Sequence, residues 1–271
     1  VMAMAKKYIR PDKAHIVVVG NKDEVADKLL KFDNSGELDF YDPFGNKVEM
    51  SSEAAPSDMT AESVIEKHIK AIGGKENMAK VNSIKLVAGM NLMGQDFEMV
   101  MIRKDGKYYQ KMGNESMTIQ EQIFDGEKAK MNSMAGNQTI TEGPELEALK
   151  KEAKLFAVLD YLTDAYTLDL KGIEKVDGSD AYKIIAKDEN DNAETMYFDK
   201  ETLMLSKVVT TQEANGQTVT ISTSLKEYFE VEGLMFPKKM SIVGGAPFPI
   251  SLEFTTTEVN GDVDDSIFVI E

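Results

Sequence analysis

Apolar and polar positions follow a period of two over most of the chain beyond residue 82. Such alternation is typical of half-buried strands. Polar turns that contain glycine, such as Asp105-Gly106 and Asp125-Gly126, separate the alternating segments, as in antiparallel hairpins. The predicted strands are 83–93, 97–104, 107–112, 116–124, 128–132, 137–141, 166–174, 181–188, 193–199, 203–213, 218–231, 234–243 and 248–260.

Two segments have a helical period instead. Residues 60–72 carry an apolar stripe that includes Val64, Ile65 and Ile69, and Gly73-Gly74 follows it as a stop. Residues 144–162 are predicted as one long helix with proline in its first turn. About a dozen consecutive antiparallel strands curl into a bent sheet or a barrel, and two helices are enough to fill the bend. The expected fold class is α+β: a strongly curved antiparallel sheet, an unclosed β-barrel, wrapped around helices.

The first 48 residues have a different pattern. Residues 14–20 form a continuous apolar run that predicts a strand buried on both faces. A helix is expected over 21–32 and a second strand over 38–42. One helix and two strands cannot close a core, so this piece is predicted to be a small α/β remnant. Residues 49–59 are polar, small and proline-containing, which predicts a linker, and residues 60–271 form the main domain.

Charge and composition argue against several classes of function. The chain has 271 residues and a formal net charge of −16, which disfavours nucleic acid and anionic lipid surfaces as partners. It has no run of 18 apolar residues, so we expect no membrane-spanning helix. Cysteine is absent and the chain has only two histidines, His15 and His68. We therefore expect no catalytic residue, no metal ligand and no cofactor in this chain.

One polar turn resembles part of a calcium-binding loop. Asp188, Asn190, Asn192 and Asp199 occupy positions 1, 3, 5 and 12 of that pattern. The glycine required at position 6 is replaced by Ala193, and the flanking segments are predicted strands. The favoured interpretation is an ordinary hairpin turn.

Methionine is the strongest compositional signal, with 17 residues in the chain. Eight of them lie between Met90 and Met134. Methionine is frequent where a surface adapts to varied apolar ligands, but it also fills ordinary cores, so both interpretations stay open. If a cavity exists, the candidate lining residues, chosen by apolar character and strand phase, are Met90, Leu92, Met99, Met101, Ile119, Phe156, Leu159, Phe198, Phe236 and Phe254.

Residues 5–48 carry a first resemblance to a known family. The segment from Ala5 to Asn21, AKKYIRPDKAHIVVVGN, resembles the closing strand and helix of a pitrilysin/insulinase-type zinc peptidase domain. The His-x-x-Glu-His zinc motif of such enzymes is absent here. The resemblance implies a fragment of a longer chain, or a partner half without catalytic groups, with zinc only in the peptidase portion.

Residues 60–271 resemble the periplasmic lipoprotein carriers of the Lol type. The motifs are Ala71-Ile72-Gly73-Gly74, QIFDGEKA at 122–129, FDKETL at 198–203 and YFEVEGLMFP at 228–237. The resemblance implies an unclosed barrel whose concave apolar face receives acyl chains. It also implies a location in the periplasm or at the outer membrane of a Gram-negative bacterium.

The combined hypothesis is a non-catalytic lipid-binding or apolar-ligand-binding module at the C-terminus of an envelope zinc peptidase. Its expected partners are an acyl chain, a lipoprotein or another apolar ligand, and the peptidase domain of the parent protein. The alternative is a docking or substrate-presenting domain of that peptidase without a bound lipid. A self-standing hydrolase is disfavoured because the chain has so few histidines.

Overall fold

The structure is a computed structural model in which residues 15–20, 22–32, 38–41, 45, 47–48, 53–92, 94–134, 136–214, 217–246 and 248–270 are described. The chain forms two compact units, Val1–Val48 and Glu49–Glu271. Residues 49–52 of the predicted linker and residues 1–14 of the predicted remnant lie outside the described residues.

The first unit contains helix α2 (Lys22–Leu29) and the strands β1 (Phe40–Tyr41) and β2 (Lys47–Val48), which pair with each other. The strand predicted over 14–20 is wrong for the described residues 15–20, which are irregular. Val17 is 84% exposed and Val19 97% exposed. A buried strand needs neighbours on both sides, and the two described strands of this unit pair only with each other.

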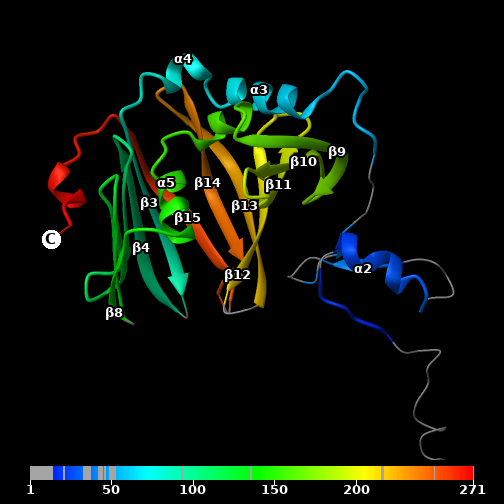
Figure 1. Ribbon diagram of the computed structural model, residues 1–271, viewed down its shortest axis with the longest axis horizontal. Coiled ribbons are helices and arrows are strands. Elements are labelled where there is room, and N and C mark those ends of the chain that lie inside the picture. Colours follow the sequence, from blue (N-terminus) through cyan, green and yellow to red (C-terminus); the bar gives the residue numbers. More distant parts are fainter. Residues whose placement is uncertain are drawn as a thin grey trace, which may run out of the picture. The chain divides into compact units, whose positions relative to one another are not determined.

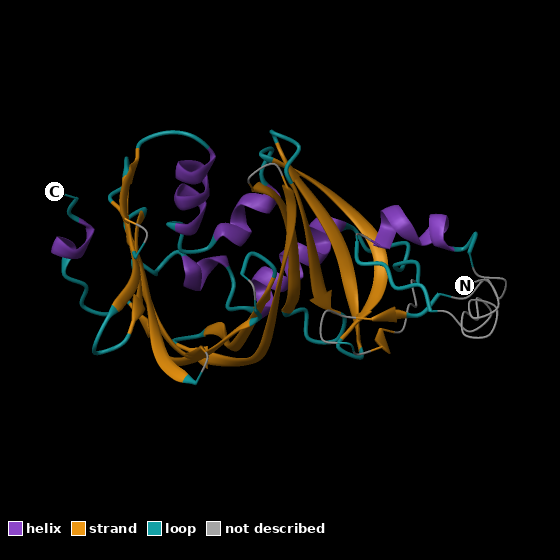
Figure 2. Ribbon diagram, turned by 90° about the horizontal axis from the view of Figure 1, so that it is seen from below, coloured by secondary structure: helices purple, strands orange, loops and turns teal. Residues whose placement is uncertain are grey.

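The second unit is built on one antiparallel sheet of 13 strands (Figure 1), in the order β8-β7-β6-β5-β4-β3-β15-β14-β13-β12-β11-β10-β9. The curved, unclosed sheet confirms the predicted fold class, and helical segments lie on its concave side (Figure 2). The strands are β3 (Ser83–Leu92), β4 (Gln95–Lys104), β5 (Lys107–Gly113), β6 (Thr118–Phe124), β7 (Ala129–Ser133), β8 (Gly136–Ile140), β9 (Tyr166–Val176), β10 (Ser179–Asp188), β11 (Ala193–Asp199), β12 (Leu205–Ala214), β13 (Gln217–Val231), β14 (Leu234–Val243) and β15 (Ile250–Val259).

The order of strands shows how the sheet is assembled. One meander, β3 to β8, runs from the centre of the sheet to one edge, and the other, β9 to β15, runs from the opposite edge back to the centre, where β15 pairs with β3. The two outer strands, β8 and β9, are consecutive in the chain, and their connection contains helix α5 (Pro144–Glu152) and the 3-10 helix η2 (Ala157–Leu162). The helical connection therefore crosses the open side of the sheet.

Helix α3 (Ala61–Ala71) begins at a capping box in which Thr60 and Ser63 each bond the other's backbone N–H. Its apolar stripe, with Val64 and Ile65 fully buried, packs against the sheet. Gly73 follows at a φ of +123°, and a Cβ there would lie 2.5 Å from the carbonyl oxygen of Gly233. Only glycine fits this close approach, after which the chain continues into the short helix α4 (Lys75–Met78).

The concave face carries two separate clusters of buried apolar residues. The first core lies between α3, η2 and strands β9 to β12, and includes Ile184 and Met196. The second core lies between α5 and strands β3 to β8, and includes Phe124 and Leu149. The central strands contribute to both, because β14 places Leu234 and Phe236 in the first core while its later residues border the second.

The single helix predicted over 144–162 is wrong, because the segment consists of α5 and η2 with a break between them. Phe156, which precedes η2, has φ −138° and ψ 75°, outside the helical region. Leu146 and Leu149 of α5 are buried in the second core, whereas Tyr161 of η2 is buried in the first. One straight helix cannot bury both ends in separate cores, so the chain bends where it passes from one to the other.

The polar turn after β10 is a hairpin turn, the interpretation that the sequence favoured. Asp188 Oδ1 accepts the backbone N–H groups of Asn190 and Asn192, both at 2.9 Å, and Asp188 Oδ2 accepts from the Asn192 amide at 2.9 Å. The turn joins β10 to β11, which pair in register from Ala181 to Lys187. The Asp188 carboxylate therefore holds the turn in shape.

Candidate functional site

The ten candidate lining residues do not form one cluster. Met90, Leu92, Met99, Met101, Ile119 and Phe254 lie in or against the second core. Phe156, Leu159, Phe198 and Phe236 lie in or against the first core. Their division between two cores depends on contacts between distant segments.

The second core is bordered by apolar side chains that are only partly buried. The strands present them because their apolar positions alternate toward the concave face. We call this set the methionine-rich inner surface; it consists of Leu86, Leu92, Met99, Met112, Ile119, Met131, Met240, Ile242 and Ile250. Apolar side chains left partly exposed beside a core form a surface that a further apolar group can cover.

A cavity of about 590 Å³ lies over the five adjacent strands β13, β14, β15, β3 and β4. Met90, Phe97 and Leu252 of the second core and Met240 of the methionine-rich inner surface line it. Its other lining residues are small or polar: Gly89, Asn91, Asp96, Ser224, Lys226, Lys239, Ser241, Ser251, Glu253 and Thr255. These residues alternate along their strands with the four apolar ones and face the opposite side of the sheet from the second core. The volume lies within the range of ordinary ligand pockets, about 300–1,000 Å³.

The polar part of this cavity was not predicted from the sequence. Ser224 of β13 lies directly opposite Ser241 of β14, which lies opposite Ser251 of β15. Of the candidate residues, only Met90 lines the cavity. The signal was the register between strands, which brings three serines from separate segments into one row and cannot be read from a single strand.

Hydrogen bonds from Arg103 hold helix α5 against the sheet beside the second core. Arg103 of β4 donates from Nε to the Glu152 backbone carbonyl at 2.5 Å and from a guanidinium nitrogen to the Glu152 carboxylate at 2.9 Å. The guanidinium also lies 5.3 Å from the centre of the Tyr108 ring, a cation–π distance. These contacts fix the C-terminal end of α5 where its dipole favours positive charge.

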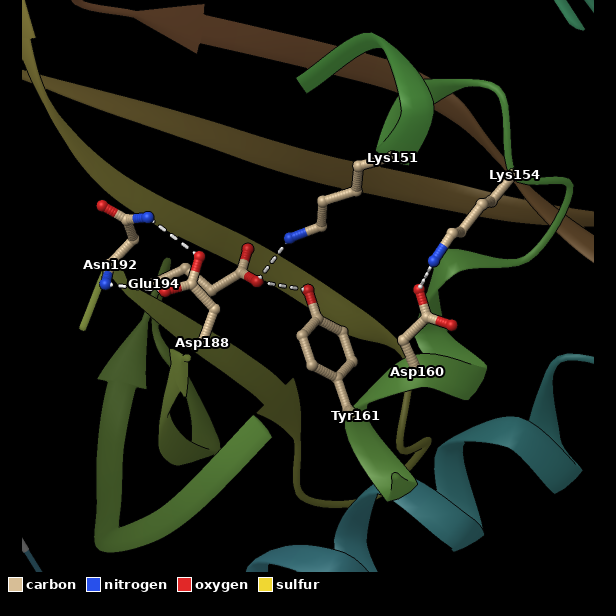
Figure 3. A network of polar contacts seen from close by, with 7 residues as sticks. All are labelled: Lys151, Lys154, Asp160, Tyr161, Asp188, Asn192 and Glu194. Carbon is tan, nitrogen blue, oxygen red and sulfur yellow. Dashed lines mark hydrogen bonds and ion pairs between the residues drawn. The ribbon is translucent and has the colours of Figure 1, made fainter. Parts of the chain in front are cut away.

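A polar network connects the same helical segment to the other half of the sheet (Figure 3). Glu194 Oε1 on β11 accepts from Tyr161 Oη at 2.6 Å and from Lys151 Nζ at 2.8 Å. Lys154 Nζ pairs with Asp160 at 2.6 Å across the bend between α5 and η2. Burial, and then the Glu194 charge, raise the pKa of Tyr161, so this phenol stays protonated at neutral pH and donates a hydrogen bond to Glu194.

His68 is part of the first core. Its Nδ1 lies 2.7 Å from the Leu203 carbonyl oxygen, and its ring centre lies 4.9 Å from that of Phe198. Because a carbonyl oxygen only accepts hydrogen bonds, Nδ1 carries the proton of the neutral imidazole. Burial lowers the pKa of His68 to about 4, against the opposing effect of this hydrogen bond. The geometry gives His68 a structural role.

The described residues contain no group of three or more histidine, aspartate or glutamate side chains arranged to hold a metal ion. In the same part of the chain, no helix is both long enough and apolar enough to cross a membrane. The features of the described site that bear on ligand binding are thus apolar surface, a cavity and hydroxyl groups.

The unclosed antiparallel sheet is similar to the folds of two solved structures. A LolA superfamily protein from Nitrosomonas europaea has this fold, with a TM-score of 0.52, 13% identity, and coverage of 78% of this chain and 98% of that chain. A DUF1329 family protein from Desulfovibrio piger aligns with a TM-score of 0.53 and 13% identity over 77% of this chain and 97% of that chain. No family model and no curated protein matches the sequence, so these comparisons establish the fold alone.

Proposed function

We propose that the second unit binds a lipid or another apolar ligand without catalysing a reaction on it. The observation that carries this proposal is the methionine-rich inner surface, a set of partly exposed apolar side chains beside the second core. The likeness to LolA superfamily structures supports it, as does the adaptability of methionine side chains. We further propose a location in the periplasm or at the outer membrane of a Gram-negative bacterium, with an acyl chain or lipoprotein as ligand.

The mechanism is burial of apolar surface. Each CH₂ group moved from water into an apolar site contributes about 0.8 kcal/mol, so ten groups supply roughly 8 kcal/mol before the cost of ordering the ligand. Affinity should therefore rise about fourfold for each added CH₂ until the site is full.

The proposal is tested by titrating the chain with fatty acids of 8 to 16 carbons in competition with a fluorescent fatty acid. The variant Met240→Gln keeps the side-chain length but adds a polar group to the methionine-rich inner surface. Met204→Gln, outside both cores and the cavity, is the matched control. We expect weaker binding only for Met240→Gln. Affinity independent of chain length, or no saturable binding, would refute the proposal.

We propose as a second candidate that residues 5–48 dock against a zinc peptidase domain, with the second unit presenting its substrate. The exposed run Ile16–Val19 favours this candidate, because four consecutive apolar side chains in water normally mark a contact surface. The test is binding of a zinc-loaded pitrilysin-type peptidase domain, measured by light scattering. Val17→Ser combined with Val19→Ser should weaken binding at least tenfold, and unchanged binding would exclude the run as the contact.

A further inference from the structure

The two edges of the sheet differ in how they are protected against pairing with another strand. At the β9 edge, Glu53 forms two backbone hydrogen bonds with Ile173, at 2.9 and 2.7 Å. Asp169 and Lys171, both exposed on β9, form an ion pair there. A covering segment and charged side chains are the usual means of blocking an edge strand.

The β8 edge has neither a described covering segment nor charged side chains of its own. Strand β8 reads Gly136-Asn137-Gln138-Thr139-Ile140 and contains no charged residue and no proline. Its first four residues are exposed, and no strand among the described residues pairs with its outer side. An exposed edge of this kind offers unpaired backbone N–H and C=O groups to another extended chain.

A hollow of about 180 Å³ lies beside this edge, lined by Met131, Ser133, Gly136, Asn137 and Gln138. Met131 lies opposite Gln138 and belongs to the methionine-rich inner surface. The hollow is smaller than a site for a whole ligand, about 300 Å³ or more, but it suits a single apolar side chain. An edge strand with a side-chain pocket is the arrangement by which sheets bind extended peptides.

We propose that β8 is a docking edge for an extended segment of another polypeptide, with apolar and polar residues in alternation. The segment adds as a fourteenth strand next to the 13 present. Its apolar side chains face inward, with one in the hollow beside Met131, and its polar side chains face outward. The docked stretch is uncharged, to match an edge and a hollow lined only by uncharged residues.

A second copy of this chain fits the edge less well. In a symmetric β8–β8 pair the incoming strand would place Gly136, Gln138 and Ile140 on the inward face. The first two supply no apolar side chain, and Ile140 is buried in the second core of its own chain. Each copy also carries a net charge of −16, so two copies repel one another. The occupant is therefore a different polypeptide.

The backbone alternation identifies the groups that would pair. Ser133 and Gly136 are the facing residues at the turn of the β7–β8 hairpin. Hydrogen-bonded and non-hydrogen-bonded pairs alternate from there, which directs the N–H groups of Asn137 and Thr139 to the outer side of β8. Proline at either position removes an outward donor without removing a hydrogen bond to β7.

The test measures binding of a labelled hexapeptide of alternating threonine and valine by fluorescence anisotropy. The chain should bind it saturably, and Thr139→Val, which retains the N–H, should bind within twofold. Thr139→Pro should weaken binding at least tenfold, and Asn137→Pro serves as a second blocking variant. A peptide N-methylated at alternate amides should also bind at least tenfold more weakly to the unaltered chain, which removes any dependence on how a proline variant folds.

Equal binding by the proline variants, or no saturable binding by the unaltered chain, would overturn the proposal. Sedimentation velocity provides the remaining outcome: a dimer that Thr139→Pro converts to a monomer would assign the edge to a second copy and overturn the proposal as well. Fatty-acid binding at the part of the methionine-rich inner surface formed by Met240, Ile242 and Ile250, on β14 and β15, should be unchanged in Thr139→Pro. The two proposals can therefore fail separately.

Discussion

Protonation of His68 should destabilise the second unit in mild acid. The His68 side chain is 4% exposed, and its Nδ1–H donates to the Leu203 carbonyl oxygen. A charged imidazole would lose its hydration in this apolar core, which is why the pKa is lowered to about 4. In the unfolded chain the pKa returns to about 6.5. Between these values the unfolded state binds a proton that the folded state does not.

The sign and size of the effect follow from this difference. Stability from the neutral His68 is fully present above about pH 6.5 and decreases as the pH falls toward about 4. The difference between the two pKa values corresponds to a contribution of roughly 3 kcal/mol to the unfolding free energy, of which about 2 kcal/mol is lost by pH 5. That is a large part of the 5–15 kcal/mol typical of a whole domain.

The assay is urea unfolding followed by far-ultraviolet circular dichroism at pH 8, 6 and 5, for the unaltered chain and for His68→Asn. The Asn amide can donate to the Leu203 carbonyl but does not titrate, and the carboxylates titrate in both proteins. His68→Asn loses the contact with Phe198, so it should be less stable at pH 8. The gap in unfolding free energy should then narrow by about 2 kcal/mol at pH 5. If the unfolding free energies of the unaltered chain and of His68→Asn decreased by the same amount between pH 8 and pH 5, His68 would not be a buried neutral imidazole.

Two further predictions concern stability and can be measured by urea unfolding at pH 8. Glu194→Ala should cost about 2 kcal/mol or more because it leaves Tyr161 and Lys151 without their shared acceptor; Glu194→Gln, which keeps an acceptor, should cost less, and equal costs would contradict this role. Gly74→Ala places alanine at φ +80° and ψ +157°, a region that is essentially restricted to glycine, with free space around it, and should cost about 1–3 kcal/mol. Gly73→Ala should cost clearly more because its Cβ would meet a backbone oxygen at 2.5 Å, and equal stability of the two variants would contradict the close approach.

The strands could be predicted from the sequence because their signals are local. Period-two alternation and a glycine-containing turn at the end of each segment are determined within about ten residues. The hairpin turn after Asp188 could also be predicted locally, because Ala193 stands where a calcium-binding loop requires glycine. The curvature of the sheet followed from the number of consecutive antiparallel strands, so the fold class needed no long-range information.

The errors arose where the outcome depends on distant partners. The run Ile16–Val19 has the composition of a buried strand, but composition does not supply a neighbouring strand. The helical stripe over 144–162 has a regular period, yet Leu149 and Tyr161 belong to different cores. Tertiary packing overrides local periodicity in both cases, and the row of serines in the cavity wall was missed because it depends on register.

The division into two cores bears directly on ligand binding. The segment from α5 to η2 contributes Leu149 to one core and Tyr161 to the other, and Glu194 bonds residues from both parts of it. A ligand that enters beside the second core must therefore be accommodated without displacing a segment that the first core also holds. The partly exposed methionines provide that adjustment, because an unbranched side chain changes rotamer at little cost. On this view the first core and the Glu194 network preserve the fold, while the methionine-rich inner surface adapts to the ligand.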